Sequence, residues 1–454
     1  MSYILAGLSG ILLTLSFPKS GLWWLAWVGL VPFFLALAGA RTSREAYRLT
    51  LVFGLVYFMG VFFSITSLFR FGGYWIITGW LLLALFQSLF LLIFTGAFIR
   101  LGKRFRFAAV PFLWIGVEWL RGWGPLGVSI GAVGYSQTPF LPILQVASFA
   151  QVYGVSFLVV LTNVAYAQLI LEPKRRKLPL AALFIITTAL VWGNFALSRP
   201  EEGTAKVLTV ALIQSNIDQF DRMNPRLTDQ NYKLHDAMSR QAGEKIDLIV
   251  WPETAVFAYI AQNDLYLPKL RELAAETGAY LAVGTAYFGE GKRSYNSIVT
   301  ISPSGEILSY YGKESLVPFG EYLPLRPLLY PLLRSTGYFD SEFSSDEKAC
   351  PLVIGSFEAA GAVCFESTVP ALIKKRVNGR TAFILTVTND AWFGSSSAPD
   401  LHWQAGILRA VENRRYFVQL GNTGISGLID PYGQVIKQSE LNKREVVVVK
   451  IPVR

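Results

Sequence analysis

The protein has 454 residues, of which 52% are hydrophobic and 16% are charged, whereas soluble proteins carry about 25% charged residues. The net charge of +10 lies in the first part of the chain: residues 1–197 hold 14 basic and three acidic side chains, and residues 198–454 hold 27 basic and 28 acidic ones. Because a basic nucleic-acid-binding surface would lie on a polar domain, nucleic acid is excluded as a partner, and two cysteines and two histidines leave little for a disulfide scaffold or metal centre. The composition therefore predicts a membrane protein with a soluble domain attached.

Residues 1–197 consist of apolar runs separated by short polar stretches. A membrane-spanning helix needs about 20 mostly apolar residues. The N-terminus lacks the basic region of a cleavable signal peptide, so we expect the first run to be retained as a helix. Seven runs qualify as candidate spans: 3–17, 22–40, 49–69, 76–99, 107–120, 141–171 and 178–197.

The orientation of these helices follows from the basic residues in the loops. Loops 41–48, 100–106 and 172–177 carry eleven Lys and Arg residues, and the alternate loops carry three. Basic loops stay in the cytoplasm, which places the N-terminus there. With seven crossings, the chain after residue 197 emerges on the outer, periplasmic side.

Residues 198–205 are predicted to be a polar linker, and residues 206–454 a single soluble domain. Strands and helices alternate along this domain, which indicates an α/β layered fold with a mixed sheet. Turn signals lie at 303–306 and 431–434. Buried strands are predicted at 207–213, 246–251, 280–284, 359–364, 382–388 and 446–449, and helices at 226–243, 264–277 and 402–417.

Three predicted strands end at a residue that can do chemistry: Glu253, Lys313 and Cys364. In α/β domains the strand ends are where sites assemble from distant parts of the chain. A thiol reacts as its thiolate and, with an ordinary pKa of about 8.5, needs a base or a positive field. Glu253 could accept the thiol proton. Lys313 could stabilise both the thiolate and the tetrahedral oxyanion that follows.

Taken singly, each of these residues has a plainer interpretation. Cys364 and Cys350 could be small buried hydrophobes, and a disulfide between them is conceivable outside the cytoplasm and would disable the nucleophile. Glu253 could be a carboxylate at a helix N-terminus, and Lys313 a solvated strand end. The two histidines lie in predicted helices, have no motif nearby and are interpreted as structural: His235 and His402.

The order and spacing of Glu253, Lys313 and Cys364 resemble the catalytic triad of the nitrilase (carbon–nitrogen hydrolase) superfamily. The surrounding segments are similar to motifs of the bacterial apolipoprotein N-acyltransferase family, and the resemblance covers nearly the whole chain. In the soluble half these segments are 312–322, 389–394 and 409–412, and in the membrane half 118–122, 134–137 and 154–158 with Asn163.

The resemblance implies a fold and a reaction. We expect a membrane-embedded α-helical bundle of about seven helices, followed by a nitrilase-like α-β-β-α sandwich, in the inner membrane with the catalytic domain on the periplasmic side. The reaction moves an acyl chain from a phospholipid to the α-amino group of the diacylglyceryl-cysteine of an apolipoprotein. No cofactor or metal is implied, and the chain is expected to act as a monomer.

The resemblance also assigns roles to residues. Glu253 corresponds to the general base, Cys364 to the nucleophile that becomes a thioester, and Lys313 to the oxyanion stabiliser, which gives a ping-pong scheme. Glu321 corresponds to a second glutamate that supports the lysine. Glu366 falls on another position on which the family relies.

Glu118 and Arg121 lie near the outer end of the fifth predicted span. An ionisable group inside a membrane segment costs roughly 3 kcal/mol on insertion scales and marks a site by default. At positions i and i+3 the two can meet on one helix face. They are either a structural pair or a contact for the lipid head group near the mouth of the site.

The sequence departs from the family pattern at a few positions. Phe365 follows the nucleophile where many members have Tyr, Met223 stands near the place of a Trp, and Gln419 stands where an Arg is usual. The sequence ends at Arg454 after the last predicted strand, whereas the family continues into another membrane helix. These departures concern lipid and acceptor recognition and anchoring, and leave the triad intact.

Two other functions are compatible with parts of the sequence. A membrane-tethered carbon–nitrogen hydrolase, or amidase, would use the same triad, but it would not need the membrane motifs. A catalytically silent lipid-binding scaffold would keep the fold without needing Glu253, Lys313 and Cys364, all of which are present.

Overall fold

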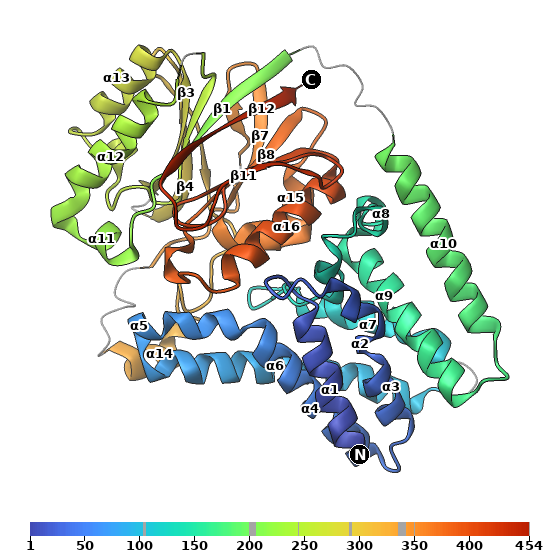
Figure 1. Cartoon of the computed structure of the whole chain (residues 1–454). Coiled ribbons are helices and arrows are strands. Elements are labelled where there is room, and N and C mark those ends of the chain that lie inside the picture. The colour runs from blue at the N-terminus through green and yellow to red at the C-terminus, as the bar shows by residue number, and fades with distance from the viewer. Residues whose placement is uncertain are drawn as a thin grey trace. The chain divides into compact units, whose positions relative to one another are not determined.

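The computed structural model describes residues 1–102, 106–198, 206–243, 245–289, 293–334, 342–348 and 350–453. The chain forms two compact units (Figure 1). We call Met1–Pro200 with Ser396–Glu412 the helical unit, and Glu201–Ser395 with Asn413–Arg454 the sandwich unit. Residues 199–205 of the predicted linker lie outside the described residues. The sequence-based division differs from these units in the segment 396–412, which the sequence assigns to the soluble domain.

Every apolar run predicted as a membrane span coincides with helical structure in the helical unit. Within this unit, α1 packs against α4, α4 against α6, α7 against α9, and α9 against α10. The elements are α1 (Ser2–Leu15), η1 (Trp23–Leu25), α2 (Ala26–Gly29), α3 (Val31–Ala38), α4 (Ser43–Val61), η2 (Phe63–Leu68), α5 (Phe69–Gly72), α6 (Tyr74–Arg100), α7 (Arg106–Arg121), η3 (Val133–Gln137), α8 (Leu141–Leu144), α9 (Ala147–Leu171), α10 (Lys177–Leu197) and α16 (Ala398–Asn413), where η denotes a 3₁₀ helix.

Within the part of the chain that the structure describes, three helices are long and apolar enough to cross a membrane: α6, α9 and α10. The helix α4 and the segment Phe63–Gly72 meet the same criterion together, as a broken span bent by 54°. The helix α1 and the segment Trp23–Ala38 are apolar but shorter. The described residues thus contain three helices of membrane length, or four if the bent pair is one span. This count supports a membrane-embedded helical unit and leaves the seven crossings as a prediction.

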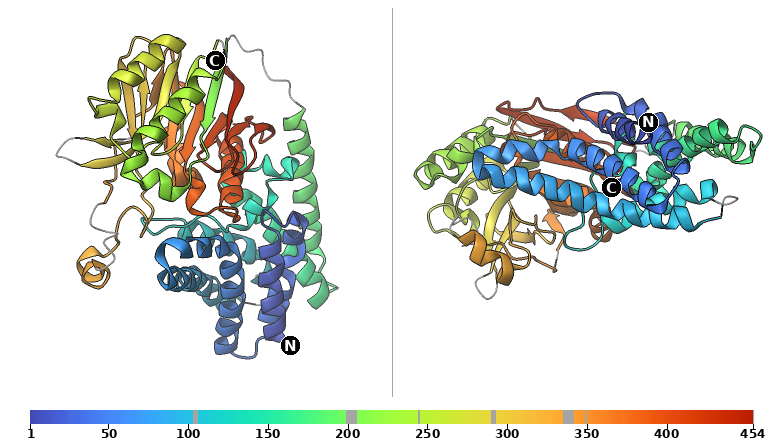
Figure 2. Two further views of the ribbon diagram at one scale, coloured as in Figure 1. Left: turned by 60° about the vertical axis from the view of Figure 1, so that its left-hand side comes forward. Right: turned by 90° about the horizontal axis from the view of Figure 1, so that it is seen from below.

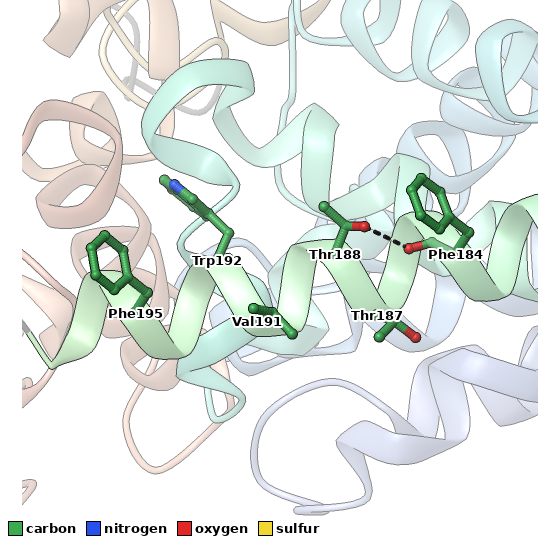
Figure 3. A pocket seen from close by; sticks show the side chains of 6 residues that line it. All are labelled: Phe184, Thr187, Thr188, Val191, Trp192 and Phe195. Carbon is green, nitrogen blue, oxygen red and sulfur yellow. Dashed lines mark hydrogen bonds between the residues drawn. The ribbon is translucent and has the colours of Figure 1, made fainter.

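The helix α10 carries exposed apolar side chains, and Figure 3 labels three of them, Phe184, Val191 and Phe195, among the residues that line a pocket. Phe184 and Val191 are 72% and 66% exposed, which is how a helix that faces lipid presents its side chains. The Thr188 hydroxyl donates a hydrogen bond to the Phe184 carbonyl one turn earlier, at 2.9 Å. Its polar group is therefore satisfied inside the helix.

The break between α2 and α3 is closed by a side chain of α9. Asn163 accepts a hydrogen bond from the Leu30 amide and donates one to the Ala26 carbonyl, each at 2.8 Å. Backbone groups inside a membrane domain must find partners within the protein. Asn163, which lies beside one of the membrane motifs, supplies those partners here.

The helix α16 is held in the helical unit by a second polar contact of this kind. Gln151 has φ of +52° and interrupts α9. The adjacent Val152 amide donates to Glu412 Oε1 of α16 at 2.9 Å, and Glu412 also pairs with Arg409 at 2.7 Å. The hydrogen bond from Val152 to Glu412 connects α16 to α9, and this contact accounts for the grouping of a segment of the predicted soluble domain with the membrane helices.

The sandwich unit contains two six-stranded sheets, with strand orders β12-β1-β2-β3-β4-β5 and β11-β10-β9-β8-β7-β6. Parallel and antiparallel pairs occur in both, so the predicted mixed α/β architecture is confirmed. The strands are β1 (Lys206–Gln214), β2 (Leu248–Trp251), β3 (Tyr280–Phe288), β4 (Ser294–Ile301), β5 (Ile307–Gly312), β6 (Leu352–Ile354), β7 (Phe357–Val363), β8 (Thr381–Thr388), β9 (Tyr416–Gly421), β10 (Gly427–Ile429), β11 (Val435–Gln438) and β12 (Glu445–Val453).

Apolar side chains from both sheets form one core. Leu212 and Val250 of the first sheet belong to the same buried cluster as Val363 and Leu385 of the second. A second cluster joins the first sheet to α12 (Thr228–Arg240) and α13 (Leu267–Thr277), which cover its outer face (Figures 1 and 2). The strands are continuous apolar runs because both of their faces are buried.

Two sequence predictions need correction in their bounds. The predicted helix 402–417 is α16, which ends at Asn413, and β9 begins at Tyr416. Arg414 has φ of +49°, so the backbone leaves the helical region before the apolar strand starts. The predicted strand 446–449 is part of the longer β12, which pairs with β1 over its whole length. The predicted turns at 303–306 and 431–434 connect β4 to β5 and β10 to β11.

Candidate active site

The ends of three strands bring the predicted triad residues together in the sandwich unit. Glu253 follows β2, Lys313 follows β5 and Cys364 follows β7. Lys313 Nζ lies 3.8 Å from Glu253 Oε1. The Cys364 thiol interacts electrostatically with both charged groups. Residues separated by 111 positions in the sequence therefore share one cluster, in which Glu253 and Lys313 are buried and Cys364 is half-buried.

The Glu253 carboxylate is held from both sides. Its Oε1 accepts from Asn296 Nδ2 at 2.7 Å, and its Oε2 accepts from the backbone amide of Asn389 at 2.8 Å. A Cβ atom on Gly284 of β3 would lie 2.1 Å from the Pro252 carbonyl. Only glycine lets the chain that carries Glu253 pass so close to the neighbouring strand.

Lys313 forms an ion pair with Glu321, the residue that the family resemblance proposes as a supporting glutamate. The lysine side chain is 1% exposed, and its Nζ lies 2.8 Å from Glu321 Oε2. The same oxygen of Glu321 accepts from the Val317 amide at 2.9 Å. A buried ammonium group must be paired to remain charged, and Glu321 with Glu253 provides that pairing.

Asn296 links the two carboxylates and was not identified from the sequence. Its Nδ2 donates to Glu253 at 2.7 Å and to Glu321 at 2.9 Å. Its backbone carbonyl accepts from the Lys313 backbone amide at 2.8 Å. The only feature of the sequence that could have indicated its role is the presence of a polar amide inside the largely apolar strand β4. An amide can donate to two anions at once, so Asn296 fixes the distance between them.

Cys364 occupies a strained backbone conformation at the start of the 3₁₀ helix η8 (Cys364–Thr368). Its φ is +53°, in the left-handed region that residues with a side chain rarely adopt. Strain of this kind is found at functional positions. The thiols of Cys364 and Cys350 are both free, so the conceivable disulfide between them is not formed.

Glu366 joins the end of β5 to the end of β7. Its Oε1 accepts from the amides of Glu314 and Ser315 at 2.8 and 2.9 Å, and its Oε2 accepts from the Val363 amide at 2.8 Å. Arg376 donates to the same carboxylate at 2.9 Å. Glu366 therefore fixes the residues next to Lys313 and Cys364 rather than the reacting groups themselves. Phe365, between Cys364 and Glu366, is half-buried.

The protonation states of the cluster follow from burial and pairing. Burial and the Glu253 charge raise the pKa of the Cys364 thiol against the opposing effect of Lys313. Burial would lower the pKa of Lys313, but Glu321 and Glu253 outweigh burial and raise it. The pKa of Glu253 is raised by burial and by Glu321, and Lys313 opposes this shift. The resting thiol is thus protonated beside a charged lysine, and it needs a base to react.

The other positions that the sequence singled out lie around or outside this cluster. Met223 ends the helix α11 (Gln219–Met223) and is exposed. Gln419 is buried in β9 and donates to the Ile425 carbonyl at 3.0 Å. His235 is buried in α12 against Trp251, and His402 is buried in α16.

Glu118 and Arg121 belong to the helical unit and are 4% and 2% exposed. Glu118 Oε1 accepts from the Val133 amide at 2.8 Å. Arg121 Nη1 donates to the Ile130 carbonyl at 2.9 Å and to Gln87 Oε1 at 3.0 Å. These contacts with the chain itself favour the structural interpretation of the pair, and a lipid contact stays a prediction.

Comparison with known proteins covers both halves of the chain. Residues 9–165 match the family model of the apolipoprotein N-acyltransferase N-terminal domain, and residues 209–454 match that of carbon-nitrogen hydrolases. The chain is 34% identical to an apolipoprotein N-acyltransferase of Geobacter metallireducens, over 98% of this chain and 88% of the relative. It is 31% identical to that of Pasteurella multocida, over 96% and 87%. Among solved structures, a nitrilase-superfamily amidase of Nesterenkonia AN1 aligns with a TM-score of 0.42 and 20% identity, over 56% of this chain and 92% of that chain.

Proposed function

The chain belongs to the apolipoprotein N-acyltransferase family, and on that premise we propose that Glu253, Lys313 and Cys364 carry out the acyl transfer. The protein is an enzyme that moves an acyl chain from a phospholipid to an apolipoprotein. The observation that carries the assignment is the buried cluster at three strand ends, where Lys313 Nζ lies 3.8 Å from Glu253 Oε1. All its groups come from one chain, so we expect a monomer to be active.

In the first half-reaction the Cys364 sulfur attacks the ester carbonyl carbon of the phospholipid while Glu253 takes the thiol proton. The carbon–sulfur bond forms, and the carbonyl oxygen becomes an oxyanion that the Lys313 ammonium group stabilises. Collapse of this intermediate breaks the ester carbon–oxygen bond, and the proton held by Glu253 passes to the leaving lysophospholipid oxygen. The product is a thioester on Cys364.

In the second half-reaction the α-amino group of the diacylglyceryl-cysteine attacks the thioester carbon. Glu253 accepts a proton from the amine, the carbon–sulfur bond breaks, and the Cys364 sulfur regains its proton. An amide is formed and the enzyme returns to its starting state. The burial of Glu253 and Lys313 beside the half-buried Cys364 serves this step, because water that reached the thioester would release a fatty acid instead.

The direct test incubates the purified protein with phospholipid and a diacylated lipopeptide and follows the mass of the peptide. We expect the wild-type protein to add one acyl chain to the peptide amine and Cys364→Ala to add none. Cys350→Ala, which removes the other thiol, should retain full activity. Acyl transfer by Cys364→Ala would overturn the assignment, and release of free fatty acid in place of the amide would indicate the hydrolase alternative.

The family is one of the inner membrane, and we extend this to seven crossings with the sandwich unit on the periplasmic side. Support comes from the helical structure of all seven apolar runs and from the concentration of basic residues in alternate loops. The exposed thiol of Cys350 offers a test in a Cys364→Ala background. A membrane-impermeant maleimide should label it in intact spheroplasts, and should label nothing in the double variant lacking Cys350. Labelling only after lysis would reverse the orientation.

A further inference from the structure

A buried arginine lies next to the proposed catalytic cluster, on the short helix α11. Arg222 is 7% exposed, which is rare for an arginine unless its donors are all directed at protein groups. Its Nη1 donates to the Thr254 carbonyl at 2.8 Å, and its Nε donates to Gln219 Oε1 at 3.2 Å. Two donors of the guanidinium are thus engaged inside the protein, which argues against a role in gripping the phosphate of a lipid head group.

The first of these contacts fixes the backbone next to Glu253. Thr254 has φ of +43°, a conformation that a β-branched residue adopts only when its surroundings enforce it. The Arg222 hydrogen bond holds the Thr254 carbonyl, and the following amide, that of Ala255, donates to the Gly284 carbonyl at 2.9 Å. The turn that presents Glu253 is therefore secured on both sides of the strained residue.

The second contact reaches the Glu253 carboxylate by another route. Gln219 Oε1, which accepts from Arg222, also accepts from Asn389 Nδ2 at 2.7 Å. The backbone amide of Asn389 donates to Glu253 Oε2 at 2.8 Å. Arg222 is thus connected both to the backbone next to Glu253 and, through Gln219 and Asn389, to the carboxylate of Glu253.

Arg222 also contributes charge to the site. Lys313, Glu321 and Arg222 act electrostatically on Glu253, as does the Cys364 thiol. Arg222 interacts with both Glu253 and that thiol. Asp390 acts on the thiol as well. Burial lowers the pKa of Arg222 to about 10, with Glu253 and Cys364 opposing the shift, so Arg222 stays positive at neutral pH.

We propose that Arg222 is a positioning residue for the general base: it holds Glu253 in the orientation that accepts the Cys364 proton, and its charge favours the carboxylate form of Glu253. The inference rests on the proposed roles of Glu253 and Cys364. Without the positive charge the Glu253 carboxylate would bind a proton more readily, so its pKa would rise. The acidic limb of the pH profile, the range in which the acylation rate falls because Glu253 becomes protonated, would then move to higher pH.

The test measures the single-turnover rate of thioester formation between pH 5 and 9 at several phospholipid concentrations. We expect Arg222→Gln to lower the maximal rate about tenfold to a hundredfold, to move the acidic limb to higher pH and to leave the lipid concentration at half-maximal rate unchanged. Arg222→Lys keeps the charge and should restore the position of the acidic limb while remaining slower than wild type. Arg226→Gln removes an exposed arginine four residues away and should behave as wild type.

Three outcomes would overturn the inference: a wild-type rate and pH profile in Arg222→Gln, a raised half-maximal lipid concentration as its only defect, or an acidic limb in Arg222→Lys that matches Arg222→Gln. Should Arg222→Gln fail to fold, as judged by its thermal unfolding in detergent, Gln219→Ala tests the same route to Glu253 with the charge retained, and a wild-type rate in it would count against the proposal. Failure of the proposed function is a separate result, because it would appear as thioester formation by Cys364→Ala or an unaltered rate in Glu253→Gln.

Discussion

The two units each bury a group of charged side chains, and the two groups are connected in different ways. In the helical unit, Glu118 accepts a hydrogen bond from the Val133 amide, and Arg121 donates to the Ile130 carbonyl and to Gln87. In the sandwich unit, Lys313 and Glu253 are held by other side chains, chiefly Glu321 and Asn296. Burial alone therefore does not separate a reactive cluster from a structural one. The sandwich cluster is distinguished by the pairing of its charges with one another, since Lys313 lies beside both Glu321 and Glu253.

In the helical unit, the hydrogen bonds of Glu118 and Arg121 to backbone groups hold one segment of the chain in place. Arg121 and Glu118 fix the chain between α7 and η3, and the Tyr57 hydroxyl donates to the Gly131 carbonyl of the same segment at 2.9 Å. Glu366 is connected in this way inside the sandwich unit, since three of its hydrogen bonds come from backbone amides. The comparison therefore predicts that substitutions in the two kinds of cluster fail in different assays.

The largest effect is expected for Lys313→Ala. This change removes the charge that stabilises the oxyanion, a contribution of about a hundredfold or more in rate. It also removes the cation that pairs with both Glu253 and Glu321. Thioester formation, followed by the intact mass of the protein after incubation with phospholipid, should fall below detection. Lys348→Ala, at an exposed position of the same unit, is the matched control. Normal thioester formation in Lys313→Ala would place this cluster with the structural ones.

Glu366→Gln should have the next largest effect. The amide keeps the shape of the side chain, but one oxygen becomes a donor that faces the Val363 amide or those of Glu314 and Ser315. We expect thioester formation to slow about tenfold to a hundredfold through misplacement of Cys364 and Lys313, together with a lower thermal midpoint. Glu347→Gln, on the exposed surface, serves as control. A slower reaction with unchanged stability would mean that Glu366 acts on the chemistry directly.

In the helical unit, Glu118→Gln and Arg121→Leu should destabilise the fold more than they slow the reaction. Each change leaves the buried hydrogen-bonding groups around it without their charged partner, which costs about 1–3 kcal/mol or more and should appear as a lower thermal unfolding midpoint in detergent. The half-maximal phospholipid concentration should stay unchanged. Trp119→Phe, at a neighbouring exposed position of α7, is the control. A head-group contact would give the opposite pattern, with normal stability and weaker use of phospholipid.

The sequence singled out residues that carry a local signal, a reactive side chain directly after an apolar strand. Glu253, Lys313 and Cys364 each follow an apolar strand, so their meeting at one edge of the domain follows from the fold. Asn296 and Arg222 gave no such signal, because their partners lie 43 and 32 residues away and arise only when the strands pair. The grouping of α16 with the membrane helices was equally hidden, since it depends on the Val152 amide that is freed by the kink at Gln151.

The smallest effect is expected for a buried histidine that belongs to neither cluster. His235 of α12 lies outside both clusters, has Nδ1 2.8 Å from the Asn231 carbonyl and packs against Trp251 with ring centroids 5.0 Å apart. Burial lowers its pKa to about 4, whereas a histidine in the unfolded chain titrates near 6.5. The unfolded chain therefore binds a proton between these values that the folded protein does not.

Stability should consequently fall as the pH drops from about 6.5 to about 4, with up to roughly 3 kcal/mol lost over that window. His235→Leu cannot take up the proton, so its thermal midpoint should depend less steeply on pH across the same range, while its rate of thioester formation at pH 7 stays near that of wild type. The difference between the two slopes isolates His235 from carboxylates that titrate in the same window. Equal slopes would mean that His235 is protonated in the folded protein as readily as in the unfolded chain, and burial without an ionic partner would then not suffice to keep a group neutral in this domain.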